Sequence, residues 1–176
     1  MQILRISTIQ NQHWPDIEAI QNVCYPPVAQ ESLAALMSHW RVAPHLCFVA
    51  IKEEAIAGYL LAHPWPRRAI PPLGEVYEGL PNGCDSVFVH DLAILPAMRG
   101  YKLATLLVQE VLQVSQNQGY EHFSLISVQG TAKFWQRFGF VANPVGTEYA
   151  AAVARFYPGA NFSWMEKFTT GNRDHH

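Results

Sequence analysis

The chain has 176 residues, 49% of them hydrophobic, so one domain with a sizeable buried core is expected. Its net charge of -2 gives no overall positive field to favour nucleic acid or anionic lipid, and no run approaches the roughly 18 apolar residues of a membrane span. The three cysteines form no CxxC motif, which argues against a disulfide framework or a zinc site. We therefore expect a cytoplasmic protein with no nucleic-acid partner, no membrane contact and no metal.

A strand and two helices are predicted in the first forty residues. Residues 3–9 (ILRISTI) alternate between apolar and polar side chains, as a strand does. Pro15 marks a helix start and is followed by apolar residues at helical spacing up to Cys24. The segment 31–40 (ESLAALMSHW) places Leu, Met and Trp side chains on one helical face, which predicts the second helix.

A hairpin and a long loop are predicted next. Residues 46–51 (LCFVAI) and 56–63 (IAGYLLAH) flank the short polar link KEEA, a pattern typical of two antiparallel strands. Residues 64–85 are rich in Pro and Gly, and a loop of this length in a compact domain is usually functional or mobile. We expect this loop to form part of a binding-site wall.

The second half of the chain predicts alternating strands and helices. Residues 86–95 (SVFVHDLAIL) are apolar on both sides apart from a histidine and an aspartate, as in a strand of the sheet interior. The predicted elements that follow are a helix over about 99–118, a strand over 122–128, a short helix in GTAKFWQRFG and a terminal strand over 162–168. The region 141–161 is compatible with either helix or strand. We expect one domain over 1–170 and a flexible tail over 171–176.

The joint between the central strand and the long helix reads MRGYKLAT. The first amide groups of a helix have no intrahelical partners and form a positive pole, which attracts anions. Arg99 and Lys102 add positive charge, Gly100 permits close backbone approach and Ala104 leaves room for a bulky ligand. A pyrophosphate suits this joint, although the same residues also fit a plain basic surface turn that starts a helix.

The order of these elements, with LAILPAMRGYKLATLL and FWQRFGF in place, resembles the GCN5-related N-acetyltransferase (GNAT) family essentially end to end. Within that family, SVFVHDLAILPAMRG and FWQRFGF resemble most closely the arylalkylamine (serotonin) N-acetyltransferase branch. The resemblance implies an α/β (α+β) GNAT fold. Its mixed central sheet has about six or seven strands, flanked by about four helices, and its central strands are splayed.

The resemblance also implies that acetyl-CoA is the cofactor. Backbone groups of Leu92 and Ile94 would pair with the pantetheine arm, and the amides from Gly100 to Thr105 would hold the pyrophosphate; the side chains of Leu92 and Ile94 can be sheet core at the same time. Lys102 stands where the family usually has glycine, which places one amide contact in doubt. The cofactor-binding residues so implied are Leu92, Ala93, Ile94, Arg99, Gly100, Tyr101, Lys102, Leu103, Ala104, Thr105, Phe134 and Trp135.

His90 is the predicted general base. Strand alternation places it on one side with Phe88, Leu92 and Ile94, and a histidine is well matched to accept a proton from an ammonium, directly or through water. The alternative is a hydrogen-bonded core histidine. In the arylalkylamine enzymes two histidines stand at the positions of Phe88 and His90, and only the second is present here. Asp91 is expected on the opposite side, unless a bulge interrupts the strand.

The proton donor for the coenzyme A thiolate is open. The family commonly has a tyrosine where this chain has Trp135, and an indole N–H is too weak an acid for that role. Tyr149 and Tyr157 are the predicted phenol donors, with water as an alternative; either tyrosine could equally be an ordinary packing residue.

The function expected from this resemblance is direct acetyl transfer to a primary amine of a small substrate. Aromatic residues Tyr25, Trp65, Tyr77 and Tyr157 suggest an aromatic or apolar acceptor wall, although such residues also serve as packing anchors. The alternatives are a peptide or protein amine as acceptor, a catalytically weak acyl-CoA sensor, or an α/β domain without a cofactor. The protein is expected to be a monomer or a homodimer.

Overall fold

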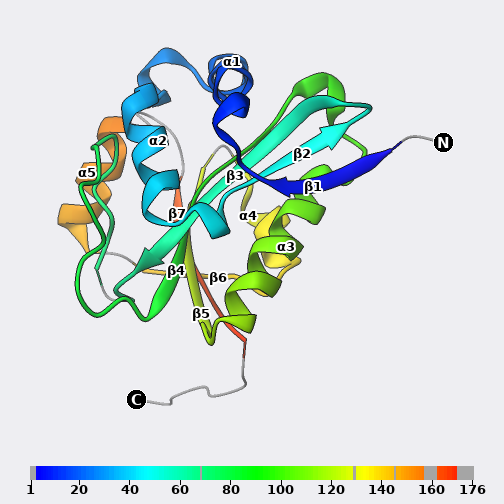
Figure 1. The fold of residues 1–176 in the computed structure, drawn as a ribbon. Helices are drawn as coiled ribbons and strands as arrows, with labels where there is room; N and C mark the ends of the chain where they lie inside the picture. The colour runs from blue at the N-terminus through cyan, green and yellow to red at the C-terminus, as the bar shows by residue number, and fades with distance from the viewer. Residues whose placement is uncertain (1–2, 68, 129, 145, 157–161, 170–176) are drawn as a thin grey trace.

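A seven-stranded sheet in the order β1-β2-β3-β4-β5-β7-β6 organises the computed structural model, which describes residues 3–67, 69–128, 130–144, 146–156 and 162–169 (Figure 1). The strands are β1 (Leu4–Thr8), β2 (Phe48–Lys52), β3 (Ala55–Trp65), β4 (Ser86–Ile94), β5 (His122–Ser127), β6 (Val141–Asn143) and β7 (Ser163–Phe168). The helices are α1 (Trp14–Cys24), α2 (Leu33–Val42), α3 (Leu103–Asn117), α4 (Ala132–Gln136) and α5 (Thr147–Phe156). In the described part of the chain, no helix is both long and apolar enough to cross a membrane.

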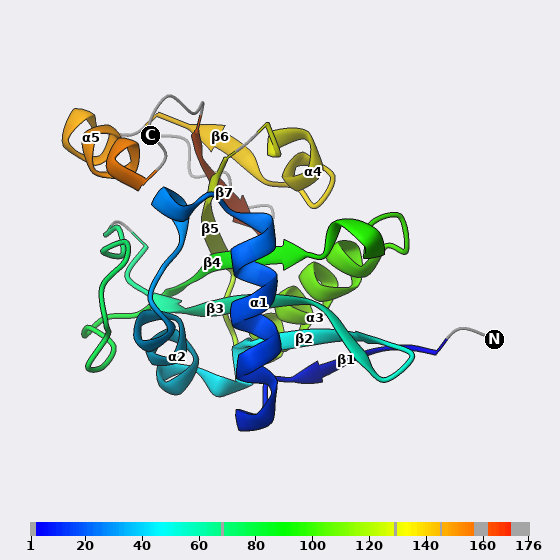
Figure 2. The ribbon, with the colours of Figure 1, turned by 90° about the horizontal axis from the view of Figure 1, so that it is seen from above.

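Helices cover both faces of the sheet, so the central strands are buried on each side. Helices α1 and α2 lie on one face and α3 lies on the other (Figures 1 and 2). Ile17 of α1 and Leu36 of α2 pack with Tyr59 of β3 in one core, and Leu107 of α3 packs with Leu60 in the other. Alternate residues of β3 thus serve the two cores, as the period of two in a strand requires.

The order of elements agrees with the sequence predictions, and two details differ. Helix α3 begins at Leu103 rather than near 99, because Gly100 and Lys102 have positive φ angles that no helix can include. The region 141–161, for which helix and strand were alternatives, contains one of each: the strand β6 and the helix α5. The predicted tail 171–176 lies outside the described residues.

The central strands β4 and β5 diverge, as predicted. They pair in parallel only where Val87–Val89 meets Phe123–Leu125, although β4 continues to Ile94 and β5 to Ser127. On the side toward β5, β4 beyond Val89 therefore faces a gap instead of a neighbouring strand. The carbonyl oxygens of Leu92 and Ile94 accept there from the side chains of Tyr25 at 3.2 Å and Cys24 at 3.3 Å, since buried backbone polar groups require a partner.

A β-bulge in β4 overturns the predicted alternation of its side chains. Leu61 pairs with Asp91 and Ala62 pairs with Val89, so His90 is an extra residue without a partner in β3. Because the bulge reverses the alternation, His90 contacts α2 on one face, whereas Leu92 and Ile94 pack into the core beside α3 on the other. The expectation that His90 shares a face with Leu92 and Ile94 is therefore wrong.

A hydrogen-bonded chain ties β4, β5 and β7 together at the end opposite the gap. Ser86 Oγ lies 2.6 Å from His122 Nδ1, and His122 Nε2 lies 3.0 Å from Glu166 Oε1. The amide of Asn143 in β6 donates to the other carboxylate oxygen of Glu166. The hydrogen bond from His122, together with that from Asn143, holds the pKa of Glu166 below its usual range against the opposing effect of burial.

Glu166 is therefore expected to make the fold less stable in acid. Folding lowers the pKa of this carboxyl, so its charged form stabilises the native state at pH values above the unfolded pKa of about 4.3. This stabilisation is lost as the pH falls toward the lower pKa of the folded state. Glu166→Gln should flatten the fall in the free energy of unfolding below about pH 5. Urea unfolding at a series of pH values measures this, with the exposed Glu110→Gln as the control. An unchanged pH dependence in Glu166→Gln would contradict the assignment.

Candidate active site

The gap between β4 and β5 opens into a cavity of ≈ 390 Å³. The lining includes seven of the predicted cofactor residues: Leu92, Ala93, Ile94, Arg99, Ala104, Phe134 and Trp135. Its other walls come from α1, from the bulge in β4, and from β5 with the loop after it: Cys24, Tyr25, Val89, His90, Asp91, Leu125, Ile126, Val128 and Thr131. The cavity therefore runs along the unpaired edge of β4 to the beginning of α3.

The other five predicted cofactor residues lie at the start of α3 without lining this cavity. The Leu103 side chain is in the core, and the Tyr101 ring lies 3.6 Å from Lys52 Nζ. Thr105 Oγ1 accepts a hydrogen bond from Arg137 at 3.3 Å. The first intrahelical bond runs from Leu106 N–H to Lys102 O at 3.0 Å, so the amides of residues 103–105 have no partner within the helix. This turn can therefore offer its backbone to an anion.

Lys102 holds a left-handed backbone conformation, with φ 59° and ψ 22°, at the N-cap of α3. A residue with a Cβ atom is strained there, whereas glycine is not. Lys102→Gly is therefore expected to raise the free energy of unfolding by about 0.5–1 kcal/mol, measured by urea unfolding. Lys133→Gly within α4 is the control, and it should destabilise by about 1 kcal/mol because its backbone is helical. A loss of stability in Lys102→Gly would contradict the argument.

His90 forms a short hydrogen bond to a buried carboxylate. Its Nε2 lies 2.7 Å from Glu31 Oε2, and only 2% of its side chain is exposed. Burial lowers the pKa of His90, but the Glu31 carboxylate more than reverses this, and the pKa is raised. Burial likewise opposes the charge on Glu31, yet His90 and His39 hold the pKa of Glu31 well below its usual range. His90 and Glu31 therefore favour each other's charged forms.

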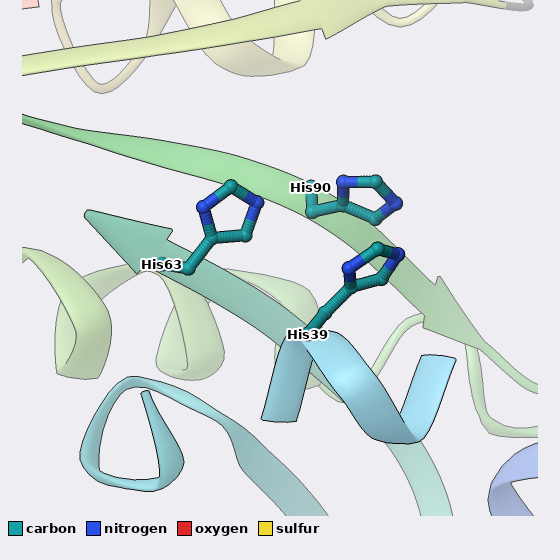
Figure 3. Close-up of side chains that lie close together, drawn as sticks. All are labelled: His39, His63 and His90. Carbon is teal, nitrogen blue, oxygen red and sulfur yellow. The ribbon is translucent and has the colours of Figure 1, made fainter. Parts of the chain in front are cut away.

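Two further histidines surround His90, and the sequence did not indicate either. His39 comes from α2 and His63 from β3, and their ring centroids lie 4.0 Å and 5.7 Å from that of His90 (Figure 3). Burial lowers the pKa of His39 to about 4 and that of His63 to about 3. Neither histidine belongs to a spaced motif, because the pairing of β3 with β4 brings His63 near His90 and the packing of α2 on the sheet adds His39.

Asp91 lies on the same side of the sheet as His90, because of the bulge. Its carboxylate accepts hydrogen bonds from the hydroxyls of Tyr25 at 2.7 Å and Tyr59 at 2.6 Å. Burial raises the pKa of Asp91 to about 6, against the effect of these two hydrogen bonds. The Tyr25 hydroxyl also lies 3.2 Å from Leu92 O, so it stands at the edge of β4 inside the cavity.

A second, smaller cavity of ≈ 20 Å³ adjoins the bulge from the α1–α2 side. It shares three lining residues with the larger cavity, Tyr25, His90 and Asp91. Its remaining walls are Gln21, Ala29, Glu31, Leu73 and Gly74. The Gly74 N–H donates to Glu31 Oε1 at 3.0 Å, so the Pro-rich loop 64–85 forms part of this wall.

Except for Tyr25, the predicted proton donors and aromatic wall residues either do not line the two cavities or lie outside the described residues. Tyr149 packs edge-on against Trp164, with centroids 5.8 Å apart, and does not line either described cavity. Tyr157 lies outside the described residues. Trp65 and Tyr77 stack on each other at 5.5 Å, beside the three histidines rather than in the cavities. The role of each tyrosine as a proton donor stays a prediction.

The comparisons with known proteins agree with this geometry. Residues 14–140 match the family model described as acetyltransferase (GNAT) family. The chain belongs to the GNAT family. No curated protein sequence matches it. Among solved structures, a GNAT family acetyltransferase from Brucella melitensis in complex with acetyl-CoA is 19% identical, with a TM-score of 0.58 over 92% of this chain and 86% of that chain.

Two further solved GNAT structures are similar in fold. Arabidopsis thaliana Naa50 in complex with the bisubstrate analogue CoA-Ac-MVNAL is 14% identical, with a TM-score of 0.70 over 93% of this chain and 97% of that chain. The ribosomal-protein-S18-alanine N-acetyltransferase from Escherichia coli is 12% identical, with a TM-score of 0.67 over 99% of both chains. The GNAT fold with its mixed seven-stranded sheet is thus shown, as the sequence predicted.

Proposed function

We propose that this GNAT protein transfers an acetyl group from acetyl-CoA to a primary amine of a small aromatic or apolar substrate. The observation that carries the proposal is that two cavities meet at the bulge of β4, where they share Tyr25, His90 and Asp91. A larger cavity for the donor and a smaller one for the amino group of the acceptor would bring the thioester and the amine together at these residues.

The larger cavity is suited to the thioester end and pantetheine arm of acetyl-CoA. The unpaired edge of β4 over Leu92–Ile94 offers backbone groups to a pantetheine arm, and Arg99 with the amides of residues 103–105 offers positive charge and donors to a pyrophosphate. When bound, acetyl-CoA supplies the acetyl group as an activated thioester. The Brucella protein was solved in complex with acetyl-CoA and the Arabidopsis protein with a CoA-containing bisubstrate analogue, which supports the same assignment.

The smaller cavity fits an amine. Glu31 and Asp91 are the acidic residues in its wall, and their negative charge would attract an ammonium group. Tyr25 supplies an aromatic surface where the two cavities meet, and the ring of an arylalkylamine would lie beside it, because the smaller cavity of ≈ 20 Å³ has room only for the ammonium group. The resemblance of SVFVHDLAILPAMRG to the arylalkylamine N-acetyltransferases supports the same acceptor class.

His90 is proposed as the base that removes the proton of the amine. A carboxylate only accepts hydrogen bonds, so His90 Nε2 carries the hydrogen that bonds to Glu31, and in the neutral ring Nδ1 holds the lone pair that can accept a proton. A proton taken at Nδ1 through a water molecule would create an imidazolium, which Glu31 stabilises as the aspartate does in a catalytic triad. Tyr149 and Tyr157 remain our candidates for the thiolate's proton donor, and Tyr25 joins them because it lines both cavities.

A thiol-release assay with acetyl-CoA tests the proposal. The acceptors should be a panel of arylalkylamines, polyamines, amino acids and short peptides, and thiol release should exceed the acceptor-free rate most with an arylalkylamine. Release with peptides alone would move the acceptor class to peptide amines. Coenzyme A binding by calorimetry without release from any acceptor would favour an acyl-CoA sensor, and the absence of binding would contradict the proposal entirely. The three free cysteines suit the reducing cytoplasm, where we propose that the protein acts.

A further inference from the structure

The side chains of His39, His63 and His90 form a buried cluster. One ring nitrogen from each histidine lies within 4.8 Å of the corresponding nitrogens of the other two. Figure 3 shows that a nitrogen of each ring is turned toward the space between the rings. His39 comes from α2, His63 from β3 and His90 from β4, so regular secondary structure holds all three side chains.

The hydrogen bonds at the far side of each ring fix which nitrogen has the lone pair. The Nε2 atoms of His39 and His90 face the two oxygens of Glu31 at 3.3 Å and 2.7 Å. His63 Nδ1 lies 3.0 Å from the carbonyl oxygen of Pro64. Carboxylate and carbonyl oxygens only accept, so each of these nitrogens carries the hydrogen. In the neutral form of each ring, the opposite nitrogen is therefore left as an acceptor.

These three acceptor nitrogens have no hydrogen-bond partner among the described residues. His39 Nδ1, His63 Nε2 and His90 Nδ1 are each fully buried without one. Buried polar atoms in folded proteins are nearly always paired, and an unpaired one costs about 1–3 kcal/mol. Three lone pairs that face a common space also repel one another. A cation placed between them would satisfy all three at once.

We propose that His39, His63 and His90 bind one divalent transition-metal ion, with zinc as the preferred metal. Neutral imidazole nitrogen is a ligand for zinc, copper and nickel, and three histidines with an open fourth position form a known type of zinc site. Zinc–nitrogen bonds of ~2.0–2.1 Å place tetrahedral ligands about 3.3 Å apart, so nitrogens within 4.8 Å need to move by less than about 1 Å each.

Glu31 would be the carboxylate that commonly accepts hydrogen bonds from the outer ring nitrogens of metal-binding histidines. Its two oxygens accept from the outer nitrogens of His39 and His90, which fixes both ring orientations and makes both ligands more basic. Metal at this site would also occupy the lone pair of His90. Under the proposed function, the metal-loaded protein should therefore transfer acetyl groups more slowly, whereas metal binding itself does not depend on that function.

Metal content and cobalt spectroscopy test the inference without any measurement of acetyl transfer. The full chain, with His175→Ala and His176→Ala to remove the terminal histidine pair, should be stripped with chelator, loaded with Zn²⁺ and desalted. We expect one equivalent of zinc by elemental analysis. Co²⁺ should give the visible absorption of a four-coordinate site, and Zn²⁺ should raise the midpoint of thermal unfolding.

The variants decide whether the three histidines are the ligands. His39→Ala and His63→Ala should each weaken zinc affinity by more than about 100-fold, and Glu31→Gln should weaken it by about 10- to 100-fold. His45→Ala, which removes an exposed histidine, should leave affinity unchanged. The shift in unfolding midpoint on zinc addition is compared within each variant, so a less stable variant still reports. No zinc in the parent protein, or zinc retained in both His39→Ala and His63→Ala, would overturn the proposal in favour of a buried water.

Discussion

His90→Ala is expected to lower kcat by about 10²- to 10⁴-fold, which is the usual contribution of a positioned general base. His90 lines both cavities at the bulge, and the Glu31 carboxylate orients its ring and favours its charged form. Coenzyme A affinity should change little, because the residues that we propose face the cofactor arm are the β4 edge and the start of α3. Steady-state kinetics in the presence of chelator, together with calorimetry of coenzyme A binding, measure the two effects separately.

A structural role for His90 predicts a different pattern. His90→Gln can still donate a hydrogen bond to Glu31 but cannot accept a proton, so it should be as slow as His90→Ala while it retains more stability. His45→Ala is the matched control and should keep the parental rate, because His45 is exposed and away from the cavities. Activity restored by glutamine, or a kcat within about twofold of the parent in His90→Ala, would show that His90 is not the base.

Gly58→Ala is expected to destabilise the fold by about 1–3 kcal/mol, the range typical of overpacking a core. Gly58 of β3 pairs with Ile94, and a Cβ atom there would collide with Ile94 Cδ1 and lie 2.7 Å from the carbonyl oxygen of Ala93. Backbone cannot yield as a flexible side chain does, so β4 must shift. Because Ala93 and Ile94 line the larger cavity, coenzyme A affinity should also fall, by about tenfold for each 1.4 kcal/mol of binding energy lost.

Gly79→Ala provides the matched control for this glycine. A Cβ atom at Gly79 would meet no heavy atom within 4 Å, so the free energy of unfolding should change by less than about 0.5 kcal/mol. Urea unfolding and calorimetry of coenzyme A binding compare the two variants. Equal stability and equal affinity in Gly58→Ala and the parent would contradict the prediction, because the added methyl group would then cause no strain against Ala93 and Ile94 of β4.

The order of strands and helices followed from local patterns in the sequence. Alternation in residues 3–9 and helical spacing after Pro15 report which face of each element is apolar, and this depends only on neighbours in the chain. The doubly apolar stretch 86–95 likewise marked the central strand. The sequence also predicted the turn at Arg99, Gly100 and Lys102, because a glycine, basic residues and the free amides at a helix start are features of one short segment. The left-handed backbone of Lys102 was seen only in the structure.

The arrangement of chemical groups around His90 was decided by tertiary structure. A single unpaired residue in β4 brought Asp91 to the side of His90, and strand periodicity cannot reveal such a bulge because it depends on register with β3. Glu31, His39 and His63 lie 59, 51 and 27 positions from His90 in the printed numbering, so no local spacing connects them. They meet because β3 pairs with β4, and because α2 and the residues just before it pack against these strands. The sequence by itself determined most of the elements, their order and the turn before α3, whereas packing between distant segments determined which side chains cluster around His90.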